Sequence, residues 1–117
     1  MAFAITERER IGPVLLVEMS GRLVMGEASD KLEEELQRRI AAGERALLLD
    51  WAGVSVIDSQ GLKALVHGVI SIRKVGGQLK LVSVDPRVRE VLETTRLLTV
   101  IDAYDNREAA LRSFGGA

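Results

Sequence analysis

The sequence predicts an α/β fold: one domain over residues 1–117, with a mostly parallel sheet of four or five strands, an antiparallel edge hairpin and about four helices. Three observations support this. The length of 117 residues suits one domain, and no linker, low-complexity block or internal repeat divides it. After the first two strands, short apolar runs alternate with amphipathic stretches, giving the order ββαβαβαβα and right-handed crossovers. Hydrophobic residues make up 47% and aromatic residues only 3%, so the core must be aliphatic.

The first third of the chain predicts a hairpin and a helix. Residues 3–10 suit an edge strand, Gly12-Pro13 a turn, and residues 14–19 a more apolar strand, and so short a gap favours a hairpin. A helix is expected over about residues 26–42, ended by Gly43. Its buried face is marked by apolar residues at helical spacing, Leu32, Leu36 and Ile40.

The middle of the chain predicts a buried strand followed by a long helix. Residues 46–50 form a continuous apolar run, as in strands that are covered on both faces. Residues 51–55 are expected to be a connection in which Trp51 shields the core. A helix then spans residues 59–75 and ends at Gly76-Gly77. Its expected buried stripe consists of Leu62, Leu65, Val66, Val69 and Ile72 or Arg73.

The last third predicts two further strand–helix units. Residues 79–83 suit a strand, and Asp85-Pro86 suits a helix start, with a cap followed by proline at the first helical position. A last strand is expected at residues 99–101. Asp105 and Glu108 have the spacing of a capping box for a final helix. The apolar side of the third helix is expected to carry Val88, Val91 and Leu92.

Composition excludes several classes of function. The net charge is −1 with both signs interspersed, so there is no basic surface for direct nucleic-acid binding, and too few aromatic side chains to stack on bases. Cysteine is absent, which excludes disulfides, thiolate nucleophiles and Cys-ligated zinc.

No segment predicts export or membrane insertion. The N-terminus lacks a basic region followed by a long apolar stretch. The longest apolar stretch, residues 61–72, is interrupted by Lys63 and His67 and is too short to span a bilayer. We therefore expect a cytoplasmic domain.

The most informative segment is the turn at residues 56–62, between an apolar strand and a long helix. Asp58 is expected to cap the helix, which places the Ser59 hydroxyl on the first exposed turn, near the positive end of the helix dipole. The hypothesis is that Ser59 is a phosphorylated switch and not a catalyst. Gly61 either admits a partner's backbone or packs tightly against the neighbouring strand, and Leu62 is expected in the core.

The sequence does not predict an enzyme, and no cofactor is expected. It contains no nucleophile–base pair, metal-ligand cluster or phosphate-binding glycine loop. His67 is the one histidine and is expected at the surface or its boundary. Asp50 could suggest a receiver-type phospho-acceptor, but residues 20–22 lack the acidic pair that would hold magnesium. Asp85 is interpreted as a helix cap.

The segment Asp50–Leu62 resembles the signature of STAS domains, which include the bacterial anti-sigma factor antagonists. Gly76–Leu81 and Asp85-Pro86-x-Val88 resemble the next segments of that family, so the resemblance covers nearly the whole chain. It implies that a GHKL-type serine kinase, the anti-sigma factor, phosphorylates Ser59 and that a PP2C-type phosphatase restores binding. The partner-binding and switch residues implied are Asp58, Ser59, Gln60, Gly61 and Lys63.

The chain departs from the family pattern at three positions. Val24 stands where many antagonists have an acidic residue, Gln60 where they have a small one and Lys63 where they have glycine. The alternative hypothesis is a STAS subunit of a stress-signalling scaffold or of a lipid-transport ABC complex, without a phospho-switch. Nucleotide binding stays open, although no P-loop is present.

A phosphate on Ser59 is expected to act on association rather than on folding. First-turn amides of the free helix would offset part of its charge, while Asp58 would oppose it. In a close interface, an unpaired dianion that has lost its water costs several kcal/mol. A loss of roughly 3–4 kcal/mol weakens binding about a hundred- to a thousand-fold.

Overall fold

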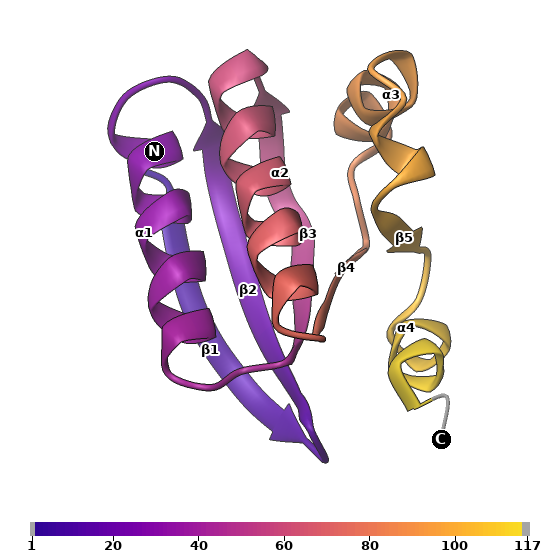
Figure 1. The fold of residues 1–117 in the computed structure, drawn as a ribbon. Helices are drawn as coiled ribbons and strands as arrows, with labels where there is room; N and C mark the ends of the chain where they lie inside the picture. Colours follow the sequence, from indigo (N-terminus) through magenta and orange to yellow (C-terminus); the bar gives the residue numbers. More distant parts are fainter. Residues whose placement is uncertain (1, 116–117) are drawn as a thin grey trace.

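The computed structural model describes residues 2–115 and confirms the predicted fold class (Figure 1). A five-stranded sheet has its strands in sequence order, with β1 antiparallel to β2 and the other neighbours parallel. The elements follow the predicted order and are β1 (Ala4–Ile11), β2 (Val14–Leu23), α1 (Glu27–Ala41), β3 (Ala46–Ile57), α2 (Ser59–Lys74), β4 (Gln78–Val82), α3 (Pro86–Thr94), the 3-10 turn η1 (Leu97–Thr99), β5 (Asp102–Tyr104) and α4 (Arg107–Gly115).

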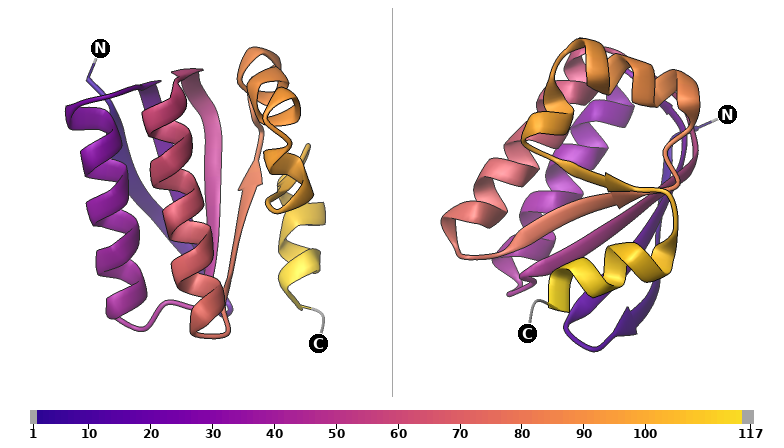
Figure 2. Two further views of the ribbon diagram at one scale, coloured as in Figure 1. Left: turned by 45° about the horizontal axis from the view of Figure 1, so that its top comes forward. Right: turned by 90° about the vertical axis from the view of Figure 1, so that its right-hand side faces the viewer.

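Helices cover the two faces of the sheet unequally. Helices α1, α2 and α3 pack on one face, where alternate residues of the strands such as Leu15, Leu47 and Leu81 form the main core. Helix α4 lies on the opposite face (Figure 2), where its Ala110 packs on a smaller cluster. That cluster contains Val14, Leu16, Leu48 and Val82.

Strand β3 is longer than predicted, because residues 51–55 are strand and not a connection. Strand β2 also runs further than residue 19, to Leu23, and its end pairs with the end of β3, including Leu23 with Ile57. Register shifts after Glu18 and Gly21 mark two irregularities in this pairing. The partner strand, which lies far away in sequence, therefore completes the hydrogen bonds that extend β3.

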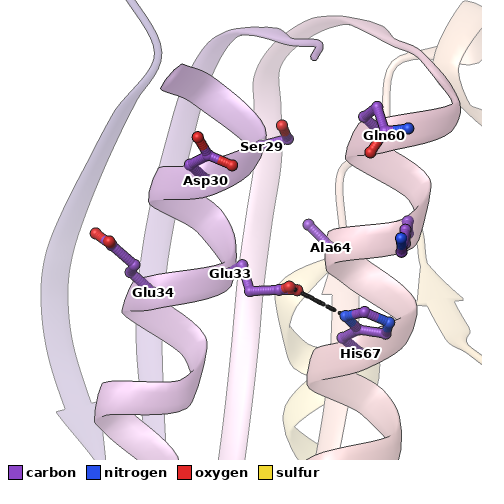
Figure 3. A pocket seen from close by; sticks show the side chains of 8 residues that line it. Ser29, Asp30, Glu33, Glu34, Gln60, Ala64 and His67 are labelled. Carbon is purple, nitrogen blue, oxygen red and sulfur yellow. Dashed lines mark hydrogen bonds and ion pairs between the residues drawn. The ribbon is translucent and has the colours of Figure 1, made fainter. Parts of the chain in front are cut away.

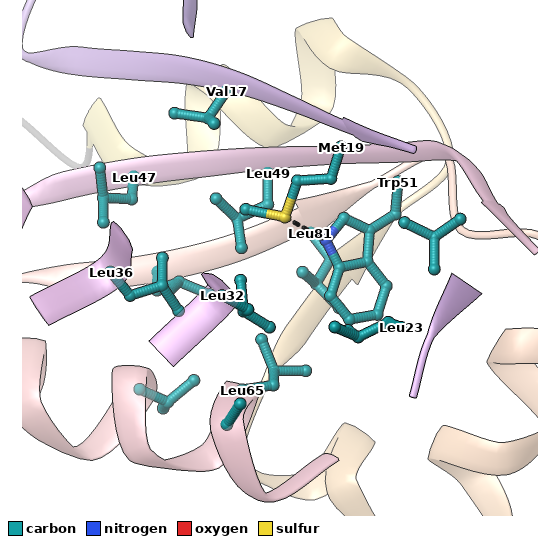
Figure 4. Close-up of a cluster of buried hydrophobic side chains, with 14 of the residues drawn as sticks. Val17, Met19, Leu23, Leu32, Leu36, Leu47, Leu49, Trp51, Leu65 and Leu81 are labelled. Carbon is teal, nitrogen blue, oxygen red and sulfur yellow. Dashed lines mark hydrogen bonds between the residues drawn. The ribbon is translucent and has the colours of Figure 1, made fainter. Parts of the chain in front are cut away.

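Trp51 lies on this extension and is fully buried, which confirms its assignment to the core. Its Nε1 donates to the Met19 Sδ at 3.2 Å, and leucine side chains surround the pair (Figure 4). The indole thus satisfies its one polar group inside the aliphatic core.

The C-terminal third differs from the prediction in two places. Residues 97–99 form η1, and the last strand begins only at Asp102, so the strand predicted at residues 99–101 is wrong. Helix α4 begins at Arg107, one residue too late for Asp105 to cap it. Asn106 caps it instead, since its Oδ1 accepts from the Ala109 amide at 2.9 Å.

Helices α1 and α2 end as expected. Gly43 has φ +106° just after α1, and the amides of Gly43 and Glu44 donate to the carbonyls of Ile40 and Arg39. This is the left-handed terminus that favours glycine. Gly76 has φ +82° after α2, which confirms the predicted end of that helix.

The buried stripe of α2 is made of smaller residues than predicted. Leu65, Val69 and Ile72 are buried, while Leu62 and Val66 are only half-buried. Ala64 and Gly68 take the inner positions, because α1 crosses closely there. A Cβ on Gly68 would lie 2.5 Å from the Leu36 Cδ1 of α1.

Candidate switch and partner-binding site

Asp58 joins three segments at the start of α2. Its backbone is extended, with φ −115°, and its Oδ1 accepts from the Gln60 and Gly61 amides, each at 3.0 Å. These bonds confirm the predicted cap. Its Oδ2 accepts from the Met25 amide at 2.8 Å. One carboxylate thus fixes the β2–α1 connection against the first turn of α2.

The same three bonds stabilise the charged form of Asp58. The Gly61 amide, followed by the Met25 amide and then the Gln60 amide, lowers the pKa of Asp58 below its ordinary value, and partial burial opposes them. The carboxylate is therefore negative at neutral pH and fully engaged with backbone donors.

Ser59 is the first residue of α2 and is exposed to solvent. Ser59 therefore lies on the exposed first turn of the helix, as the sequence predicted. Among the hydrogen bonds of residues 2–115, none involves the Ser59 side chain, so its esterification breaks no bond in the described structure.

The first-turn amides of α2 can offset less of a phosphate's charge than the sequence predicted. The amides of Gln60 and Gly61 already donate to Asp58, and the Leu62 amide donates to the Asp58 carbonyl at 3.0 Å. A phosphate on Ser59 would find these donors occupied. Its charge must be balanced by water, by the helix dipole or by a side chain.

Gly61 is buried against the sheet, which decides between the two interpretations that the sequence left open. A Cβ at this position would lie 2.4 Å from the Leu23 carbonyl oxygen and 3.1 Å from the Ile57 Cγ1. Close packing within the chain therefore accounts for the glycine. Leu62 beside it is half-buried and packs against the main core.

Gln60 and Lys63 are exposed and line a groove of about 380 Å³ between α1 and α2. The opposite wall carries carboxylates of α1, among them Asp30 (Figure 3). Glu33 of α1 and His67 of α2 point toward each other across the groove, with the Glu33 Oε1 2.6 Å from the His67 Nδ1. This pair confirms the surface position predicted for His67.

Met25 is a site residue that the sequence analysis missed. The residue is 72% exposed, although its amide is held by Asp58 beside Ser59. A single methionine in a connection belongs to no periodic pattern, so nothing in the sequence indicated that Met25 lies at the site. Val24 before it is half-buried.

Residues 2–115 present neither a metal centre nor a membrane-spanning helix. No group of three or more His, Asp or Glu side chains in this range could hold a metal ion. None of the described helices has both the length and the apolar character needed to cross a bilayer.

The sheet order, the capped turn and the exposed serine define a STAS-type domain. The model of the STAS domain family matches residues 3–110, and the chain belongs to this family. Within the family it is similar to anti-sigma factor antagonists. BtrV of Bordetella bronchiseptica, described as a candidate anti-sigma factor antagonist, is 32% identical over 106 residues, which cover 91% of this chain and 90% of BtrV.

Solved structures share the fold. TM1081 of Thermotoga maritima superposes with a TM-score of 0.85 at 24% identity, over 92% of each chain. The Bacillus cell fate determinant SpoIIAA in its phosphorylated form superposes with a TM-score of 0.71 at 18% identity, over 94% of this chain and 99% of SpoIIAA.

Proposed function

We propose that this protein is an anti-sigma factor antagonist that binds an anti-sigma factor while Ser59 is unmodified and is released when Ser59 is phosphorylated. One observation carries the proposal: an exposed serine at the start of α2, held beside a carboxylate that three backbone amides fix in place. The similarity to BtrV over nine-tenths of both chains supports the class of partner. The existence of phosphorylated SpoIIAA, which shares the fold, supports the kind of modification.

The proposed partner surface consists of the first turn of α2 and the groove beside it. Ser59, Gln60 and Lys63 are exposed there, whereas Asp58 and Gly61 shape the turn from beneath. In the proposed cycle, a GHKL-type kinase, the anti-sigma factor itself, modifies Ser59, and a PP2C-type phosphatase reverses the step. The outcome is control of sigma-dependent transcription in the cytoplasm by a binding domain of residues 1–117, without catalysis by this chain.

The physical basis of release is the cost of desolvating a dianion. Phosphorylation adds about −1.5 to −2 charges, and the Gln60 and Gly61 amides already bind Asp58. A partner that covers Ser59 would remove water from the phosphate without offering this chain's amides in exchange. That cost amounts to several kcal/mol and weakens binding of the phosphorylated form.

Binding of Ser59 variants to the cognate anti-sigma factor tests this function. Ser59→Ala should bind like the unmodified protein and resist inactivation by the kinase with ATP. Ser59→Asp should bind more weakly, by roughly ten- to a thousand-fold, because it places a charge in the interface. Titration calorimetry measures both affinities.

Gln78→Glu is a matched control, because it makes the same change in net charge at an exposed residue at the start of β4. It should bind like the wild type. Equal affinities for Ser59→Ala and Ser59→Asp would rule out the switch.

A further inference from the structure

A phosphate on Ser59 would have few partners among its immediate neighbours. The Gln60 and Gly61 amides donate to Asp58, and the Asp58 carboxylate repels a second anion. Apart from Lys63 and His67, the ionisable residues that line the groove beside α2 come from α1 and are acidic, and His67 is paired with Glu33. The acidic residues that line the groove are Asp30, Glu33 and Glu34.

Lys63 is the cation placed to meet such a phosphate. It follows Ser59 by four residues in α2, a spacing that brings Cβ atoms to about 5–6 Å on one helix face. Helical side chains lean toward the helix N-terminus, so the Lys63 stem extends back toward the turn of Ser59. An anion four residues before a lysine is also the favourable order of charges in a helix.

The unmodified structure leaves the Lys63 ammonium available. Lys63 is exposed and lines the groove, and it takes part in none of the ion pairs found among residues 2–115.

We propose that Lys63 is the ion-pair partner of phosphorylated Ser59, and that phosphorylation draws the Lys63 side chain off the groove toward the start of α2. This rests on the proposed function only in taking Ser59 as the modified residue. Modification then changes two parts of the partner surface together: it adds an anion at residue 59 and withdraws a cation from the rim of the acidic groove.

The pairing can be tested without the anti-sigma factor. Phosphoserine is installed at residue 59 during translation, and the second ionisation of the phosphate is followed by ³¹P NMR as a function of pH. A nearby ammonium favours the dianion and lowers the phosphate's second pKa. In Lys63→Gln, that pKa should be about 0.3 pH unit higher than in the otherwise wild-type phosphoprotein, and 1 M salt should reduce the difference.

Two variants serve as controls. Lys63→Arg keeps the cation and should titrate like the wild-type phosphoprotein. Lys74→Gln removes the same charge from the last turn of α2 and should leave the phosphate unchanged. Equal second pKa values in the wild type and Lys63→Gln would overturn the pairing, as would an equal rise in Lys74→Gln.

The test of the Lys63 pairing and the test of the Ser59 switch can fail independently of each other. If Lys63→Gln leaves the second pKa of the phosphate unchanged while Ser59→Asp still binds weakly, the pairing is wrong and the switch stands. If Ser59→Ala and Ser59→Asp bind equally while Lys63→Gln raises the second pKa of the phosphate, the switch is wrong and the pairing stands.

Discussion

At the scale of single residues, Asp58 holds the candidate site together. Its two carboxylate oxygens bind backbone donors that are far apart in sequence, the first-turn amides of α2 and the amide of Met25. The residue therefore has a structural reason to be aspartate, independent of any partner. Ser59 beside it takes no part in this network, so its modification leaves the network intact.

Asp58→Asn should destabilise the fold by about 1 kcal/mol at pH 7, because the amide group keeps one acceptor and loses the other. The folded-state pKa of Asp58 is lowered from its ordinary 3.8, so its stabilisation is present above that value. It is lost as the pH falls below 3.8 and through the folded-state pKa. Urea unfolding at about pH 7 and at about pH 2.5–3 should therefore show a smaller difference between variant and wild type at the lower pH.

Asp105→Asn is the matched control, since the Asp105 side chain is 96% exposed and lies 4.0 Å from Arg89 in a surface pair. It should cost little at either pH. A difference for Asp58→Asn that is the same at both pH values would contradict the role given to its charge.

At the scale of elements, the junction between β2 and α2 sets the position of Ser59. The first turn of α2 lies against the end of β2, and the Asp58 amide donates to the Leu23 carbonyl at 3.2 Å. Gly61 permits this approach, as its hydrogen replaces a side chain that would meet the Leu23 backbone. Because β2 and β3 extend beyond their central residues, this turn lies at the C-terminal ends of these two parallel strands.

Gly61→Ala should destabilise the protein by about 2–3 kcal/mol, because a rigid backbone carbonyl lies 2.4 Å from the new Cβ. Gly68→Ala in the same helix is the comparison. Its new Cβ meets the Leu36 Cδ1, the end of a side chain that can rotate, and alanine favours the helix by about 1 kcal/mol. Chemical denaturation should rank Gly61→Ala as clearly the less stable, and the reverse order would refute this account of the junction.

The sequence did not predict that Lys80, which joins two elements, is buried. Lys80 of β4 is only 5% exposed beneath α4, with its Nζ 4.9 Å from the centre of the Phe114 ring. The ammonium donates to the Ser113 Oγ at 2.9 Å and to the Ser113 carbonyl at 3.2 Å. These bonds, with the aromatic contact, compensate for its burial and join α4 to the sheet.

At the scale of the whole molecule, folding and switching are expected to be independent. The core lies between the sheet and helices α1 to α3, whereas Ser59 is on the outer surface. An acidic group at the first position of a helix gains from the dipole and loses by repulsion from Asp58, so the two effects offset each other.

Ser59→Asp should therefore unfold within about 0.5 kcal/mol of the wild type. Trp51, the one tryptophan, is fully buried, so its fluorescence reports on the core while circular dichroism reports on the helices. The two transitions should coincide in a cooperative domain. Leu65→Ala, at a fully buried position, should lose about 2–5 kcal/mol and shows that the assay detects core damage. A loss above about 1 kcal/mol in Ser59→Asp would show that the modification acts on folding.

The sequence predictions were correct where the interactions are local and wrong where they join residues far apart in the chain. The caps at Asp58 and Asp85 and the glycine after α1 were predicted correctly, because their hydrogen bonds join residues within a few positions of each other. The strand at residues 99–101 was wrong, since pairing with β4 begins only at Asp102. The buried stripe of α2 was shifted by the close approach of α1.

The sequence by itself determined the order of the elements, the cap at Asp58 and the serine that follows it, through apolar periodicity and side-chain chemistry that act over one or two turns. Only the tertiary structure decided the length of β3, the bond from Met25 to Asp58 and the acidic groove that faces Lys63. The physical reason is that most of these features join residues far apart in the chain, as the bond between Met25 and Asp58 does. Their contacts form only when the sheet and the helices pack together.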